Sequence, residues 1–194
     1  EEIESRYVIE EDNTVSFILD GVDEIGRGVI IDPVLTWSTY FQGVYGGYQY
    51  NPGVDDDGNI FICTQDGSGT LPVLNAGSGQ WYQGSEVGPS PNWDLAIFRF
   101  NNDLSLAWCT YYVGMGCEEG WGRRNVAVDN DNNRVYFSGE TDTPYSNSVQ
   151  TFPTYDPGSG AFYQDVSYDC GASYPFFIQM TPDGVREWAT LFTY

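Results

Sequence analysis

The sequence LTWSTYF at residues 35–41 recurs as LAWCTYY at residues 106–112 and as REWATLF at residues 186–192. The Trp residues at the centres of these segments stand 71 and then 80 residues apart. Repetition at a fixed order and long period is typical of propellers and arrays, in which one small unit recurs along the chain. The sequence therefore predicts a repeat protein, and the remaining motifs can be aligned from these three segments.

Two further motifs recur in step with the first. The segment GVDDDGNIFI at residues 53–62 matches AVDNDNNRVYF at residues 127–137 with one inserted residue. The segment DLAIFRFNND at residues 94–103 matches YPFFIQMTPD at residues 174–183. Three matches in the same order define two complete repeats.

Each repeat contains four runs of β-branched and aromatic residues bounded by Asp, Asn, Gly and Pro, which is the pattern of strands joined by turns. No sustained apolar period near 3.6 is present, so we expect almost no helix. Four antiparallel strands per repeat predict an all-β fold, a partial β-propeller of two four-stranded blades plus an extra outer strand. The expected strands are residues 49–55, 60–64, 93–100 and 104–113, and then 125–129, 135–139, 174–181 and 185–193.

The chain before the first repeat has its own strand-like runs. Residues 7–19 predict a β-hairpin that turns around residues 11–13, and residues 28–31 predict a third strand. We therefore assign residues 1–34 to an N-terminal β-segment, the end of a preceding β-rich domain, and residues 35–194 to the propeller. Within the propeller we expect a lone outer strand at residues 35–41, one blade at residues 42–113 and a second at residues 114–194. Propellers have about four to eight blades, so the chain is expected to be a fragment of a longer protein.

The sequence also resembles a known family. IDPVL at residues 31–35, WSTY at residues 37–40 and the Asp-Gly-Asn turn into IFI at residues 60–62 are similar to bacterial β-propeller repeat proteins of the SBBP type. The similarity covers roughly residues 28–194, although Asn132-Asn133 replaces the Gly-Asn of the second hairpin motif. It implies a secreted, cell-surface protein of the Bacteroidetes kind. Many such proteins are exported by the type IX secretion system and some are linked to gliding or adhesion, so partners would include secretion-system components.

Composition limits the function further. The 28 acidic and 7 basic residues give a net charge of −21, and such a surface repels phosphate backbones and anionic lipid. We therefore expect no nucleic-acid partner and, without an apolar run of about 20 residues, no direct membrane insertion. The chain contains no His, the commonest general base and metal ligand, so Ser-His-Asp, Cys-His and His-zinc sites are excluded within it. A non-catalytic role follows.

Two long inserts, residues 65–92 and residues 140–173, follow the second strand of each repeat and lie on the same face of a propeller. Loops longer than about 15 residues without structure of their own are uncommon and are often functional. Flat amphipathic rings among Gly, Ser and Asn suit sugar or protein recognition. The alternative is that the rings pack the inserts onto the blades. The candidate ligand-binding residues are Trp81, Tyr82, Trp93, Tyr145, Tyr155, Tyr163 and Tyr168.

Two acidic turns place oxygen ligands at alternate positions, which resembles a calcium loop. The sixth position, however, is Ile60 or Arg134 instead of the required Gly. We therefore favour hairpin turns, in which Asp, Asn and Gly supply positive φ, and expect no cofactor, with Ca²⁺ as the alternative. The candidate metal ligands are Asp55, Asp57, Asn59, Asp129, Asp131 and Asn133.

The four cysteines are Cys63, Cys109, Cys117 and Cys170. The first two fall within expected strands, which favours buried free thiols. Cys117 and Cys170 fall in loops on the same face of adjacent blades, so we expect a disulfide between them in an oxidising compartment.

Three hypotheses for function follow from these features. The first is a secreted surface module, an adhesin-like propeller that binds glycan or protein through its insert-bearing face. The second is a structural spacer in a large surface protein. The third is a carbohydrate-active propeller enzyme whose paired carboxylates, such as Glu118-Glu119, are completed by other blades.

Overall fold

The computed structural model describes residues 5–9, 15–19, 38–39, 41, 50–67, 69–77, 79–86, 94–114, 124–141, 145–146, 149–150, 152–165 and 174–192. The chain divides into two compact units, Glu1–Thr39 and Tyr40–Tyr194. Within the described residues every regular element is a strand, as the sequence predicts. No helix in this part of the chain is long and apolar enough to span a membrane.

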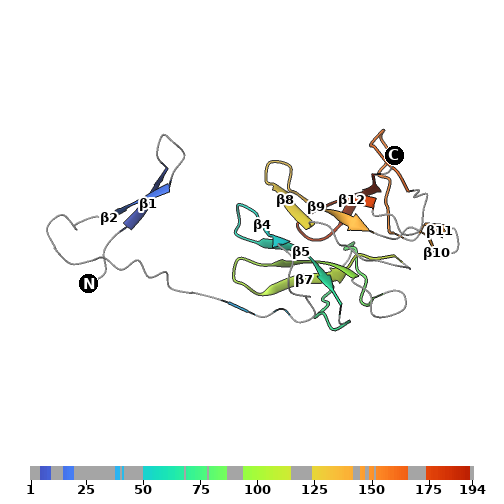
Figure 1. The fold of residues 1–194 in the computed structure, drawn as a ribbon, viewed down its shortest axis with the longest axis horizontal. Coiled ribbons are helices and arrows are strands. Elements are labelled where there is room, and N and C mark those ends of the chain that lie inside the picture. Colours follow the sequence, from blue (N-terminus) through green and yellow to red (C-terminus); the bar gives the residue numbers. More distant parts are fainter. Residues whose placement is uncertain are drawn as a thin grey trace. The chain divides into compact units, whose positions relative to one another are not determined.

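In the N-terminal unit, β1 (Ser5–Ile9) and β2 (Val15–Leu19) form an antiparallel hairpin (Figure 1), in which Ser5 pairs with Leu19 and Ile9 with Val15. This confirms the hairpin expected at residues 7–19. The third strand expected at residues 28–31 lies outside the described residues.

The larger unit contains a first sheet of four antiparallel strands in the order β4-β5-β6-β7. These strands are β4 (Gly53–Val54), β5 (Ile60–Asp66), β6 (Asp94–Phe100) and β7 (Leu106–Tyr111). The four strands are those expected for the first repeat.

The second sheet repeats this arrangement in the order β13-β12-β9-β8 and adds a short parallel strand, β3 (Tyr50–Asn51), beside β8. Its antiparallel strands are β8 (Arg124–Asp129), β9 (Arg134–Thr141), β12 (Tyr174–Met180) and β13 (Arg186–Leu191). Within the insert between β9 and β12, β10 (Tyr145–Ser146) pairs with β11 (Val149–Gln150).

The strand expected at residues 49–55 is split by Pro52 into β3 and β4. Proline has no N–H to donate to a strand ladder and fixes its own φ, so a sheet is interrupted there. The first half pairs with β8 of the second sheet, Asn51 opposite Asn125, and the second half pairs with β5 of the first sheet. One predicted strand therefore links the two sheets.

The registers of the two sheets are equivalent. Val54 pairs with Ile60 in the first sheet and Val128 with Val135 in the second, so the second hairpin is one residue longer, as the sequence alignment predicts. The last hairpin of each sheet carries a β-bulge at the same step, between Arg99 and Phe100 in one and between Gln179 and Met180 in the other. The sequence repeat is therefore a structural repeat.

The tight turns that follow these bulges are also equivalent in the two sheets. Substitutions at their equivalent residues should therefore change stability in opposite directions. Leu104 and Gly184 occupy equivalent places with φ of 69° and 82°, and their N–H groups donate to Asn101 and Thr181. This conformation costs roughly 1–2 kcal/mol for a residue with a Cβ and almost nothing for glycine. We expect Leu104→Gly to raise the free energy of unfolding by about 0.5–1 kcal/mol in urea titrations, and Gly184→Ala to lower it by at least about 1 kcal/mol. Changes of the same sign would contradict the equivalence of the turns.

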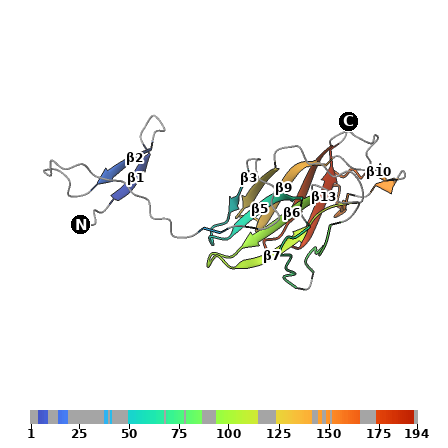
Figure 2. The same cartoon turned by 60° about the horizontal axis from the view of Figure 1, so that its bottom comes forward.

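The two sheets share one hydrophobic core, and Figure 2 shows β5, β6 and β7 running alongside β9 and β13. The first sheet contributes the face that carries Phe61, Ile97 and Trp108, and the second sheet contributes the face that carries Phe137 and Ile178. Alternate residues along a strand point to opposite faces. Each sheet therefore uses one face of its strands for this contact.

The opposite face of the first sheet carries a smaller apolar cluster built on Phe98, Phe100 and Cys109. Phe41 stacks on Phe98 with ring centroids 4.2 Å apart and meets Phe100 edge-on. Of the lone strand expected at residues 35–41 only Ser38, Thr39 and Phe41 are described, and these three lie outside the strands. A strand needs a partner for its backbone groups, and none of the described strands pairs with these three residues.

Candidate functional site

The insert between β5 and β6 lies along the outer edge of the first sheet. Leu74 and Cys109 exchange two backbone hydrogen bonds of 2.9 and 3.0 Å, and Tyr111 N–H donates to the Gln83 carbonyl at 3.1 Å. The Thr110 hydroxyl accepts from Gln83 N–H at 2.7 Å. These bonds occupy the outer edge of β7, which would otherwise expose unpaired backbone groups. We call residues 71–83 the first edge segment.

The insert between β9 and β12 makes the same bonds to β13. Tyr155 and Ala189 exchange bonds of 2.8 and 3.0 Å, Leu191 N–H donates to the Gln164 carbonyl, and Gln164 N–H donates to the Thr190 hydroxyl. We call residues 152–164 the second edge segment. The two segments read LPVLNAGSGQWYQ and FPTYDPGSGAFYQ, so they are a fourth repeated motif. This fourth motif is not among the three predicted above, although an alignment of the two inserts with each other shows it.

Trp81 belongs to the first edge segment and packs against the core. Its indole N–H donates to the Tyr111 carbonyl at 3.2 Å, and its ring centroid is 5.0 Å from that of Tyr112. Its backbone N–H donates to the Gly184 carbonyl of the second sheet at 3.0 Å. Trp81 therefore packs its insert onto both sheets, the alternative that the sequence left open, and it is partly buried.

Arg186 brings two of the candidate residues together. Its guanidinium carbon lies 4.2 Å from the centroid of the Trp81 ring and 4.8 Å from that of the Tyr155 ring. Nη1 donates to the Pro153 carbonyl at 2.9 Å and to the Tyr112 hydroxyl at 3.3 Å. A guanidinium stacked on aromatic faces is held by cation–π attraction of about 0.5–2 kcal/mol per ring. We call Trp81, Tyr112, Tyr155 and Arg186 the aromatic seam.

The Tyr112 hydroxyl is fully buried in this seam and donates to the Pro153 carbonyl. Burial raises the pKa of Tyr112, although the Arg186 charge opposes the rise. The phenol therefore stays neutral and acts as a hydrogen-bond donor that joins the first sheet to the second edge segment.

The remaining candidates differ in exposure. Tyr82 and Tyr155 present 41% and 42% of their surface to solvent, whereas Tyr163 is half-buried with its hydroxyl 3.1 Å from the Thr154 hydroxyl. Trp93, Tyr168 and the side chain of Tyr145 lie outside the described residues. The accessible rings among the described candidates are thus Tyr82 and Tyr155, one on each edge segment.

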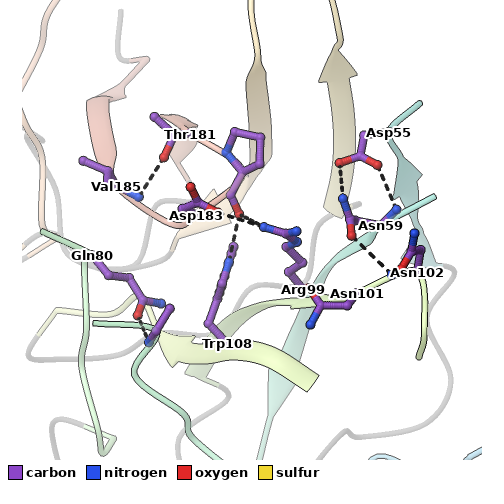
Figure 3. Close-up of polar contacts among 12 residues, drawn as sticks. Asp55, Asn59, Gln80, Arg99, Asn101, Asn102, Trp108, Thr181, Asp183 and Val185 are labelled. Carbon is purple, nitrogen blue, oxygen red and sulfur yellow. Dashed lines mark hydrogen bonds and ion pairs between the residues drawn. The ribbon is translucent and has the colours of Figure 1, made fainter. Parts of the chain in front are cut away.

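The turn between β12 and β13 is held by the first sheet, as Figure 3 shows. Trp108 Nε1 and Arg99 Nη1 both donate to the Pro182 carbonyl, at 2.9 and 3.2 Å. Arg99 also forms an ion pair with Asp183 at 3.0 Å, and its guanidinium carbon lies 5.8 Å from the centroid of the Phe61 ring. The seam and this turn together fix the second sheet on the first.

The two acidic turns are hairpin turns, as the sequence favours. The Asp55 carboxylate accepts from the backbone N–H and the side-chain amide of Asn59, both at 2.8 Å. The Asp129 carboxylate accepts from Asn132 in the same way, which lowers the pKa of Asp129. Gly58 and Asn133 adopt positive φ in these turns. Asp57 and Asp131 are exposed, and within the described residues no three His, Cys, Asp or Glu side chains form a group that could hold a metal ion.

Two buried carboxyl groups, which were not among the predicted site residues, lie where β5 ends and β6 begins. Asp66 and Asp94 pair directly across β5 and β6, and neither is exposed. The Tyr111 hydroxyl donates to Asp66 at 2.5 Å, and burial with this bond raises the pKa of Tyr111. Burial and the Asp66 charge also raise the pKa of Glu86. A sugar cannot reach the two buried carboxyls, so their geometry supports a structural role.

No protein-family model and no curated protein matches the chain. The similarity to SBBP-type repeats therefore stays a prediction.

Cys63 and Cys109 are buried thiols that form no disulfide, as the sequence predicts. Burial, assisted by the Asp66 charge, raises the pKa of Cys109 to about 12, so its thiol is protonated and unreactive at neutral pH. Cys117 and Cys170, the expected disulfide, lie outside the described residues.

Proposed function

We propose that the two sheets are successive blades of a β-propeller and that the chain belongs to a secreted, cell-surface module that binds glycan or protein without catalysis. The support for a propeller is that equivalent residues of the two repeats meet at the innermost strands. The Asn51 side chain donates to that of Asn125 at 2.9 Å, and Asn130 donates to Asp56 at 2.8 Å. Contact between like positions of adjacent units is what rotation about a common axis produces.

The observation that carries the binding function is the exposure of Tyr82 and Tyr155 on firmly held segments. Both edge segments are fixed to an outer strand by backbone hydrogen bonds, so the backbone that carries these exposed rings has little freedom left to lose. Rigid amphipathic rings bind at a low cost in conformational entropy. The net charge of −21 makes neutral glycans or basic protein surfaces the favoured ligands.

We expect the chain to bind a glycan on a glycan array or a protein in a pull-down from cell-surface extract. Calorimetry with the purified ligand then measures the affinity. Tyr82→Ala and Tyr155→Ala should each weaken binding about tenfold, as for an exposed aromatic contact worth roughly 1.4 kcal/mol. Val54→Ala is the control, because Val54 is 55% exposed and lies on β4, outside both edge segments. Equal losses in all three variants would contradict the assignment.

A structural spacer is the second candidate. It is favoured by the aromatic seam, because Trp81 and Tyr112 use their rings to join the sheets. No binding to any glycan or surface protein, with the fold intact, would favour this role. The propeller would remain in that case, since its evidence comes from the inner strands and the core.

A further inference from the structure

The face of the first sheet that meets the second sheet has an equivalent on the second sheet. The strand registers show which residues of the two sheets are equivalent. Ile97 of the first sheet corresponds to Phe177 of the second, Trp108 to Trp188, and Tyr112 to Phe192. On the first sheet these side chains are covered and are 0%, 1% and 0% exposed. We call the equivalent surface of the second sheet the open face, which comprises Tyr136, Ser138, Pro175, Phe177, Gln179, Trp188 and Phe192.

The open face is apolar but uncovered. Phe177 is 41% exposed and Phe192 is 47% exposed, and Trp188 is half-buried. Phe162, the equivalent of Trp81, is 52% exposed and lies 5.6 Å from Phe192 between ring centroids. A contiguous group of exposed aromatic side chains is typical of an interaction surface.

The contact between the two sheets specifies what would cover this face. On the first sheet, Trp108 donates its indole N–H to the Pro182 carbonyl, and Trp81 donates its backbone N–H to the Gly184 carbonyl. Both carbonyls belong to the tight turn between β12 and β13 of the second sheet. Trp188 and Phe162 stand at these positions on the open face, where the Trp188 indole N–H donates to the Phe162 carbonyl instead. Gln179 replaces Arg99 and donates to Glu187, which also pairs with Arg134, so the Arg99–Asp183 ion pair has no direct equivalent on the open face. A covering sheet therefore needs an apolar face and a tight turn whose carbonyl can accept from the backbone at Phe162, and it does not depend on an acidic side chain in that turn.

We propose that the open face binds a further four-stranded sheet of the same repeat, which covers Phe177, Trp188 and Phe192 as the second sheet covers the first. This inference rests on the propeller part of the proposed function and is independent of ligand binding by Tyr82 and Tyr155. The first sheet of a second copy fits less well, because Phe41 already stacks on Phe98 at the face that it would have to offer.

The test compares the full chain with the full chain extended after Tyr194 by one further copy of residues 114–194. Phe177→Cys is introduced into the original second sheet of both chains. Val54→Cys, at a site that is 55% exposed on the first sheet, is the control. Peptide-resolved alkylation should be about 100-fold slower or more at position 177 in the extended chain, because labelling then requires the added unit to detach. The rate at position 54 should be unchanged.

Equal rates at position 177 in the two chains would overturn the proposal. An added sheet that stays unfolded by circular dichroism, while the first two sheets remain folded, would also overturn it. A sheet that recognises the open face should fold on it. Sedimentation velocity of the unextended chain supplies a further criterion. A dimer that dissociates on Phe177→Asp would show that a second copy is the occupant, which contradicts the proposal.

Discussion

Trp108→Ala is expected to lower the free energy of unfolding by about 3–5 kcal/mol, measured from the shift of the urea midpoint at constant m-value. Trp108 is 1% exposed in the core between the two sheets, so the truncation leaves a cavity that rigid strands cannot close. It also removes the hydrogen bond to the Pro182 carbonyl. Trp108→Phe retains most of the ring, and the Pro182 carbonyl keeps its bond from Arg99, so this variant should lose only about 1–2 kcal/mol.

Trp188→Ala is the matched control for this experiment. Trp188 occupies the equivalent position in β13, but it is half-buried and lies on the open face. Its indole N–H donates to the Phe162 carbonyl at 2.8 Å, so a loss of about 1–2 kcal/mol is expected. Equal losses at positions 108 and 188 would show that the second sheet does not cover the first.

Gly53→Val is expected to destabilise the protein by about 1–3 kcal/mol in the same titration. A Cβ at position 53 would lie 2.8 Å from both Val126 Cγ1 and Val128 Cγ2, where the innermost strands of the two sheets cross closely. Valine would otherwise suit a strand, so a loss here reports steric conflict between sheets and not strand propensity.

Ala127→Val is the control for Gly53→Val. Ala127 is the equivalent residue of β8, and it is exposed because no further strand lies against it in the described residues. We expect a change of less than about 0.5 kcal/mol there. Combining Gly53→Val with Val126→Ala should recover part of the loss, and no recovery would contradict the contact.

The strands and their order could be predicted because three properties of the sequence agree. Apolar alternation, turn residues such as Gly58-Asn59 and internal repetition all mark the same segments, and the one-residue insertion in the second hairpin reappears in its register. The break at Pro52 was also readable in principle, since proline within a predicted strand marks an interruption or an edge.

The edge segments could not be predicted from local pattern. Their Gly, Ser, Asn and Pro residues are those of a loop, and their hydrogen bonds go to a strand that is 25 or more residues away in sequence. Trp81 was selected as a ligand-binding residue for its type, but its surroundings depend on packing that composition does not reveal. The special position of Arg186 could have been predicted from the repeat itself, because the other two copies of its motif begin with Leu35 and Leu106. A charge at a repeated apolar position indicates a special contact.

The second sheet covers one face of the first sheet and leaves its own equivalent face open, and this difference can be measured directly. Cys63 lies on the covered face, 2% exposed, and Ser138 is its half-buried equivalent on the open face. A Ser138→Cys variant therefore carries both positions in one molecule, and peptide-resolved alkylation under native conditions compares them directly. We predict labelling at Cys63 about 1,000-fold slower or more than at position 138, because Cys63 becomes accessible only when the sheets separate. Comparable rates at the two positions would contradict the account.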